Sequence, residues 1–311
     1  MTGSPPPHAL LRPRIAIPFL AISLIWGSTW FVITGQIAHV PPAWSVAWRF
    51  VLATAGMFGV ALVTRRVLAM PAAGHGLALA IGLFQFSGNY NFVYQAERHV
   101  TSGLVALMVG LMIVPNTVLG RVLLGQKITP RFALGSAVAI AGIVLLLVNE
   151  TREARLGGNV AAGTWLALAG MLAASISNVV QAGKAGKGIP LATLIAWAML
   201  YGTVINIALA WALAGPPVLP REPRYWAGTA YLAFAGSVVT FPLYYGLIRA
   251  IGAGRAAYHN VLVVIIAMGL STLLEGYRWS LLAAVGSVLA LAGLVVALRA
   301  KSVTSDASPS R

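Results

Sequence analysis

A single arginine, Arg49, stands inside a long apolar stretch of this sequence. The stretch begins near Ala43, so a helix would place the guanidinium six residues, or about 9 Å, past its start. No acidic residue lies within the apolar stretches to pair with it. Two interpretations are open: the side chain snorkels to a membrane surface or braces a backbone carbonyl, or it clamps the carboxylate of a bound small molecule.

Uncharged polar and aromatic side chains inside other apolar stretches are further candidates for binding a small molecule. Such groups are costly in hydrocarbon unless they face a cavity or a neighbouring helix. Gln85 and Asn89 share one helical face, and Asn91 and Tyr94 share the neighbouring face. The predicted substrate-binding residues are Trp26, Arg49, Gln85, Asn89, Asn91, Tyr94, Asn178, Gln181, Tyr244, Tyr245, Tyr258, His259 and Asn260.

Packing explains some other residues better. Serine and threonine in membrane helices commonly bond to their own backbone or to a neighbouring helix, so we expect Ser28, Thr29 and Ser175 to be structural. Trp44 and Trp48 lie near the start of the second apolar stretch, where we expect them to be interfacial anchors.

Several kinds of chemistry are disfavoured. The chain has no cysteine, and its five histidines show no metal-ligand spacing. The segment GAGRAA at Gly252 lacks the preceding strand of a dinucleotide site, and no phosphate-binding loop is present. We expect no metal, no cofactor and no enzymatic activity, although an intramembrane enzyme or a channel remains a rival. Despite a pI of about 11.1, the bases are scattered over short loops, which argues against nucleic acid as a partner.

Proton chemistry has one predicted carrier. The first apolar stretch, Ile15 to Gly35, contains no acid, so a bound cation would find no countercharge there. Glu97 and Glu275 lie at the ends of stretches, where we expect water to keep their carboxylates ordinary. His259, about five residues into the ninth stretch, is then the only side chain expected to carry a proton near neutral pH.

The surroundings of these residues are a lipid bilayer. Hydrophobic residues make up 59% of the chain and charged residues 9%, with a mean hydropathy of +0.85. Stretches long enough to cross about 30 Å of hydrocarbon recur without the alternation of barrel strands. Pro115 should kink the fourth. We predict an all-α membrane protein with ten transmembrane helices, at about 15–35, 43–63, 74–95, 101–121, 131–148, 160–181, 190–213, 225–247, 255–274 and 280–298.

Charge predicts the orientation of these helices. If the amino terminus is cytoplasmic, fourteen of the 21 lysines and arginines fall on the cytoplasmic side. The excess of positive charge on that side favours this orientation, with both termini cytoplasmic. The net charge of +15 is then a signal of topology.

The sequence repeats itself. GSAVAIAGIVLLLV from Gly135 and GSVLALAGLVVALR from Gly286 match at seven of fourteen positions, at an offset of 151 residues. Each half holds five predicted helices, an odd number, so the second half must enter the membrane inverted. Inverted repeats are a transporter architecture, in which two halves rock around a central site. The expected units are a tail at 1–14, repeats at 15–148 and 160–299, a periplasmic linker at 149–159 and a tail at 300–311.

Three short motifs give a family resemblance. WGSTWF from Trp26, the pair Arg49 and Phe50, and the hairpins GQKIT and GYRWS resemble the EamA branch of the drug/metabolite transporter superfamily. The resemblance implies a ten-helix permease of the bacterial inner membrane whose fifth and tenth helices stand outside the cavity-lining set. A glutamate often follows the hairpin glycine in that family, whereas this chain has Gln126 and Tyr277, so any role of that carboxylate is absent or moved to Glu275.

The resemblance also bears on function. It implies a secondary transporter that exports amino acids or related small metabolites, with a proton-coupled multidrug exporter as the alternative reading. We expect either uniport or exchange, or proton coupling through His259 alone. The expected partners are a small-molecule substrate and the lipid bilayer, and a homodimer is among the assemblies that the sequence allows.

Overall fold

The computed structural model describes residues 12–38, 40–124, 128–153, 159–181, 188–251 and 258–301 of the 311-residue chain. Most of both predicted tails and most of the GQKIT hairpin therefore lie outside the described residues. Within them the structure is helical and contains no strand, which confirms the all-α prediction. The elements are α1 (Pro13–Ile37), α2 (Pro42–Val63), α3 (Ala72–Ile81), η2 (Gly82–Asn89), α4 (Tyr90–Ala96), α5 (Ser102–Gly110), α6 (Ile113–Leu124), α7 (Pro130–Glu153), α8 (Val160–Gln181), α9 (Leu191–Ala214), α10 (Pro223–Ala233), η4 (Phe234–Val239), α11 (Thr240–Ile251), α13 (His259–Leu274) and α14 (Leu281–Lys301).

Eight helical spans in the described part of the chain are long and apolar enough to cross a membrane. They correspond to eight of the ten predicted helices. The ninth predicted helix is the shorter apolar α13, and the third is the continuous helical segment α3–η2–α4. Prolines begin α1, α2 and α10, where the missing backbone donor costs nothing because the first turn leaves it unpaired.

Two kinds of irregularity interrupt the spans. The fourth span breaks at residues 111–112 between α5 and α6, one turn before Pro115, as the missing proline donor predicts. The segments η2 and η4 are π-helical, which is a local widening of the helix that we did not predict from the sequence. Such widenings leave backbone carbonyls without their usual helical partners and are frequent at functional sites.

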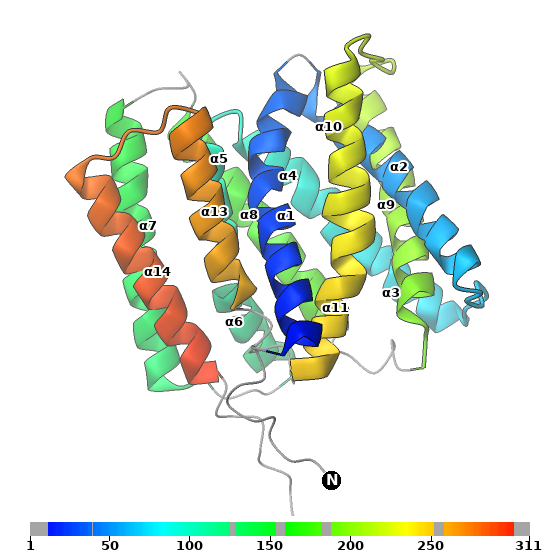
Figure 1. Cartoon of the computed structure of the whole chain (residues 1–311), viewed down its shortest axis with the longest axis horizontal. Coiled ribbons are helices and arrows are strands. Elements are labelled where there is room, and N and C mark those ends of the chain that lie inside the picture. Colours follow the sequence, from blue (N-terminus) through cyan, green and yellow to red (C-terminus); the bar gives the residue numbers. More distant parts are fainter. Residues whose placement is uncertain are drawn as a thin grey trace, which may run out of the picture.

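The repeated glycine stretches pack against one another. α7 and α14 lie side by side (Figure 1), and their contact is more extensive than that of any other pair of elements in the described chain. Gly135 faces the backbone of α14 so closely that a Cβ there would lie 2.5 Å from the nitrogen of Ala297. Gly286 faces α7 in the same way, with a Cβ 2.8 Å from the oxygen of Gly142. Small residues allow this approach, which is typical of membrane helices.

The remaining helices of the two halves interleave. α2 packs on α9, α1 packs on α13 and α11, and α8 packs on η2 and α4. The upper end in Figure 1 is the end where α1 ends and α2 begins. Because the spans alternate in direction, the segments 97–101, 215–222 and 275–280 lie at this same upper end.

Candidate functional site

Arg49 lies in the interior of the bundle. Its side chain is 2% exposed, so it does not snorkel to a surface, and that interpretation is wrong. Nη1 donates to the hydroxyl of Tyr94 at 3.2 Å, and Nη2 donates to the hydroxyls of Ser237 at 3.2 Å and Tyr90 at 3.5 Å. The guanidinium carbon also lies 4.4 Å from the centre of the Tyr90 ring, which is within cation–π range.

These partners leave the charge of Arg49 without a counterion. All three hydrogen-bond acceptors are neutral hydroxyls, and Nε has no hydrogen-bond partner. In the part of the chain that the structure describes, no carboxylate forms an ion pair with this guanidinium. A buried positive charge with unused donor capacity is suited to an anionic ligand, since guanidinium and carboxylate match in geometry.

Aromatic rings extend from Arg49 down through the bundle. The ring of Tyr90 lies 4.8 Å from Phe50, Phe50 lies 5.4 Å from Phe86, and Phe86 lies 5.2 Å from Phe241. Phe241 in turn lies 5.6 Å from Trp26. We call these five residues the aromatic column. Four of them come from the first half of the chain and Phe241 comes from the second, so the column lies where the two halves meet.

The lower end of the aromatic column is a cluster of three rings. Trp26 lies 5.3 Å from both Tyr244 and His259, and those two lie 5.0 Å apart. Trp26 also donates to the carbonyl of Gly236 at 3.1 Å, which gives a π-helical carbonyl of η4 a partner. His259 is 1% exposed. The structure thus brings three predicted site residues together, although Trp26 is more than 200 positions from the other two in sequence.

The predicted amides Asn89 and Asn91 join helices. Asn89 donates to the carbonyl of Gly170 on α8 at 2.9 Å. Asn91 donates to the carbonyl of Ser87 at 3.0 Å and to Asn206 on α9 at 2.8 Å. Asn206 donates to the carbonyl of Phe86 at 2.9 Å. It is not among the predicted site residues, although a lone amide in an apolar run could have indicated it. Asn91 and Asn206 thus donate to carbonyls of η2, and Asn89 joins η2 to α8, so the first role of these amides is structural.

Of the other predicted residues, Tyr94, Tyr245 and Gln181 are linked to this centre by contacts, and the rest have surroundings of their own. Gln85 is 3.5 Å from Asn89, and Asn178 donates to the sulfur of Met112 at 3.4 Å. Gln181 donates to Ser177 at 3.4 Å and is hydrogen-bonded to Tyr245. Tyr258 and Asn260 are half-buried at the start of α13. Tyr94 and Tyr245 flank the aromatic column, at Arg49 and at Phe241 respectively.

Two expectations about the upper end are wrong. Trp44 is 1% exposed and donates to the carbonyl of Gly215 at 3.2 Å, so it fastens a loop and does not anchor in lipid. Glu97, beyond the end of α4, is only 5% exposed and is not kept ordinary by water. Burial raises the pKa of the Glu97 carboxyl well above its usual value, and the nearby Glu275 raises it further, while Arg49 lowers it.

Glu275, which the family resemblance named as a possible replacement for the hairpin carboxylate, has a structural role. Its carboxylate accepts hydrogen bonds from the backbone nitrogen of Ser102 at 3.3 Å, from the hydroxyl of Ser102, and from Ser271 at 2.9 Å. Glu150 accepts from the backbone nitrogen of Thr101 at 2.9 Å. Both carboxylates therefore cap the amino terminus of α5, where the helix dipole favours negative charge.

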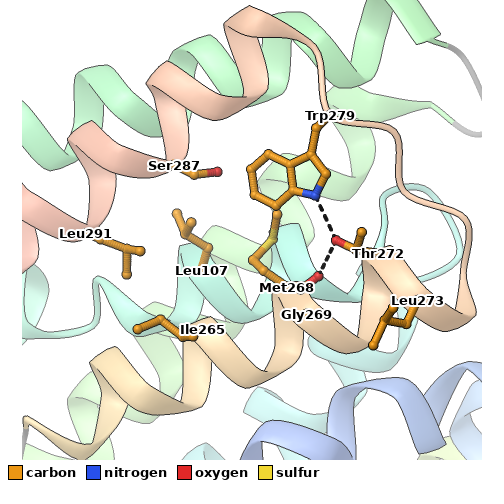
Figure 2. Close-up of a pocket in the computed structure, with 9 residues that line it drawn as sticks. All are labelled: Leu107, Ile265, Met268, Gly269, Thr272, Leu273, Trp279, Ser287 and Leu291. Atoms are coloured by element: carbon orange, nitrogen blue, oxygen red, sulfur yellow. Dashed lines mark hydrogen bonds between the residues drawn. The ribbon is translucent and has the colours of Figure 1, made fainter.

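A separate pocket of about 400 Å³ lies between α5, α13 and α14 (Figure 2). Its lining is Leu107, Ile265, Met268, Gly269, Thr272, Leu273, Trp279, Ser287 and Leu291. The indole of Trp279 donates to Thr272 at 2.9 Å, and Thr272 donates to the carbonyl of Met268 at 2.7 Å. Because its lining is mainly apolar and carries no charged side chain, the pocket lacks the means to recognise a polar metabolite.

Comparison with known proteins supports the membrane-transport reading of this arrangement. The model of the EamA-like transporter family matches residues 14–148 and 161–299. An uncharacterized inner membrane transporter of Escherichia coli, YedA, is 28% identical over 82% of this chain and 81% of its own length. A probable amino-acid metabolite efflux pump of Salmonella typhimurium is 23% identical over 89% of this chain and 92% of its own. A solved crystal structure, 21% identical, covers 94% of this chain and 100% of its own with a TM-score of 0.67, and so shares the fold.

Proposed function

The chain belongs to the EamA-like transporter family, and from that premise we propose that it is a secondary transporter. It exports amino acids or related small metabolites across the bacterial inner membrane by alternating access. The observation that carries this proposal is the buried guanidinium of Arg49, which is held only by neutral hydroxyls from both halves of the chain.

The proposed architecture is ten spans in two inverted five-helix repeats. The segment from Ala72 to Ala96 adds a span to the eight, since its 25 residues reach about 37 Å. α13 adds the tenth, because its 16 residues reach about 24 Å and the bilayer can thin locally around a short helix.

Matching irregularities support the repeat. The π-helical segment η2 covers residues 82–89, and η4 covers 234–239, within the stretch that an offset of 151 residues predicts. The start of α7 at Pro130 falls on the start of α14 at Leu281 at the same offset. A shared widening at equivalent depth is a feature that two unrelated helices would rarely have in common.

The hydrogen bonds of Arg49 suggest how transport works. Tyr90 and Tyr94 come from the first half, and Ser237 comes from η4 in the second. If the halves rock, the bond between Arg49 and Ser237 is the contact that must break, which frees guanidinium donors for a substrate carboxylate. The aromatic column then supplies apolar contact for the rest of the substrate, and the upper end opens to the periplasm, with both termini cytoplasmic.

Amino acids fit this site better than cations. A carboxylate would pair with Arg49, whereas a cationic drug would be repelled by it and would find no acid on α1. The Salmonella typhimurium relative whose name is probable amino-acid metabolite efflux pump is consistent with this choice. The aromatic column is the one feature that favours the alternative, a multidrug exporter, because flat apolar compounds stack on rings.

Counterflow in proteoliposomes tests the proposal. Vesicles loaded with unlabelled L-amino acids are diluted into a trace of the same labelled amino acid, with ethidium and a sugar as comparison solutes. A carrier predicts transient accumulation of label for at least one amino acid. Equilibration without overshoot would indicate a channel, and overshoot only with ethidium would reverse the choice of substrate.

A further inference from the structure

Glu97 is a buried carboxyl group in an unusual state. It follows α4 at the upper end of the bundle and is 5% exposed, yet neither of its oxygens has a hydrogen-bond partner. An ionised carboxylate in such a place would lose its hydration and gain no donor in return, which is costly. A neutral carboxyl group avoids most of this cost, so the surroundings select the protonated form.

The charged and titratable neighbours of Glu97 come from three elements. Glu275 follows α13, Arg49 lies on α2, and Tyr94 lies on α4. Glu275 and the nearby Glu150 accept hydrogen bonds from backbone donors at the α5 amino terminus. Glu97 therefore faces one satisfied carboxylate and one cation that is bonded elsewhere, and it is the carboxyl group with no donor of its own.

The position of Glu97 links it to the proposed substrate site. Tyr94, one turn earlier on α4, accepts a hydrogen bond from Arg49 at 3.2 Å. Any movement that opens the upper end would bring water to Glu97 and would shift α4, which carries Tyr94. A shift of α4 would therefore change both the burial of the Glu97 carboxyl group and the hydrogen bond that Tyr94 accepts from Arg49.

We propose that Glu97 is a proton-binding site of the transport cycle, protonated in the closed upper end described here and ionised when that end opens to water. On opening, the O–H bond of the carboxyl group breaks, the proton passes to water as hydronium, and the carboxylate is hydrated. Reclosing requires that the carboxylate binds a proton again, and coupling to a pH gradient requires that this proton comes from the opposite side of the membrane. This inference rests on the proposed transport function. It adds Glu97 as a proton carrier, whereas the sequence pointed to His259 alone.

The sign of the pH effect follows from the raised pKa of Glu97. The closed conformation binds the proton more tightly than the open or unfolded states do. The stabilisation that protonated Glu97 gives the closed conformation is therefore fully present below the ordinary carboxyl pKa. It is lost as pH rises through the raised pKa of Glu97. Glu97→Gln keeps the neutral shape and should remove this pH dependence.

A first experiment needs no substrate. Infrared difference spectra between acidic and alkaline buffer are recorded on the purified full chain, which has only six acidic residues. Wild type should show a carboxylic-acid carbonyl band that persists above the ordinary carboxyl range and is absent from Glu97→Gln. The exposed Glu222 provides the matched control, because Glu222→Gln should keep the band. A band that survives in Glu97→Gln, or no band in wild type, overturns the proposal.

A second experiment measures coupling with a labelled mixture of L-amino acids. A gradient of one pH unit should drive up to about tenfold accumulation in wild type and in Glu222→Gln if one proton moves per substrate. Glu97→Gln should retain exchange at equal pH and lose the gradient-driven accumulation. Exchange absent from wild type would refute the proposed function, whereas exchange present with an unchanged gradient response in Glu97→Gln would refute the proton site alone.

Discussion

Replacing Arg49 by glutamine tests whether this residue clamps a carboxylate. The substitution removes a charge that the protein itself leaves without a counterion, so the folded chain loses the bonds to the hydroxyls of Tyr94, Ser237 and Tyr90 and the cation–π contact with the Tyr90 ring. A hydrogen bond to a charged group contributes about 1.5–3 kcal/mol. One such bond to the substrate therefore corresponds to a loss of about 10- to 150-fold in affinity.

The assay compares each amino acid with its carboxamide, which lacks the negative charge, in wild type and Arg49→Gln. Competition with the labelled amino acid during counterflow gives the relative affinities. Wild type should prefer the acid by the factor above, and the mutant should lose most of that preference. Tyr94→Phe, which removes one partner of Arg49 and keeps the charge, is the matched control and should retain the preference. Equal discrimination in wild type and Arg49→Gln would refute the clamp.

Two further predictions concern the packing that supports this site. Gly142→Val should destabilise the α7–α14 pair by about 1–3 kcal/mol, because a Cβ there would lie 2.5 Å from the oxygen of Gly286; thermal unfolding in detergent measures this, and Gly59→Val, with no atom within 4 Å of its Cβ, should cost much less. Asn206→Leu should cost about 1–3 kcal/mol in the same assay, because it removes the side-chain donor to a π-helical carbonyl and one of the two acceptors of the Asn91 amide, whereas Asn260→Leu should be near neutral.

The sequence predicted those features that depend on local chemistry or on repetition. The break before Pro115 follows from one missing donor. The close contact of α7 and α14 explains why the glycine stretches recur, since Gly135 and Gly286 each face the partner backbone. Hydropathy located the helices because each must hide its backbone from lipid.

The sequence could not predict contacts between distant residues. Ser237 is 188 positions from Arg49, and no local pattern pairs them. The burial of Glu97 depends on how α2, α4 and α13 meet, so its place at the end of an apolar run suggested water instead. The π-helical segments were not predicted either, because their stability comes from distant donors such as Asn206 and Trp26.

Access to Ser237 from the two sides of the membrane tests alternating access most directly. The chain has no cysteine, so Ser237→Cys introduces a single thiol beside Arg49, at a position that is fully buried in this conformation. A membrane-impermeant thiol reagent is added to one side or the other of oriented vesicles, with and without saturating L-amino acids. The account predicts modification from either side, and a substrate-dependent shift in the ratio of the two rates. Modification from one side only, at a rate that amino acids do not change, would contradict it.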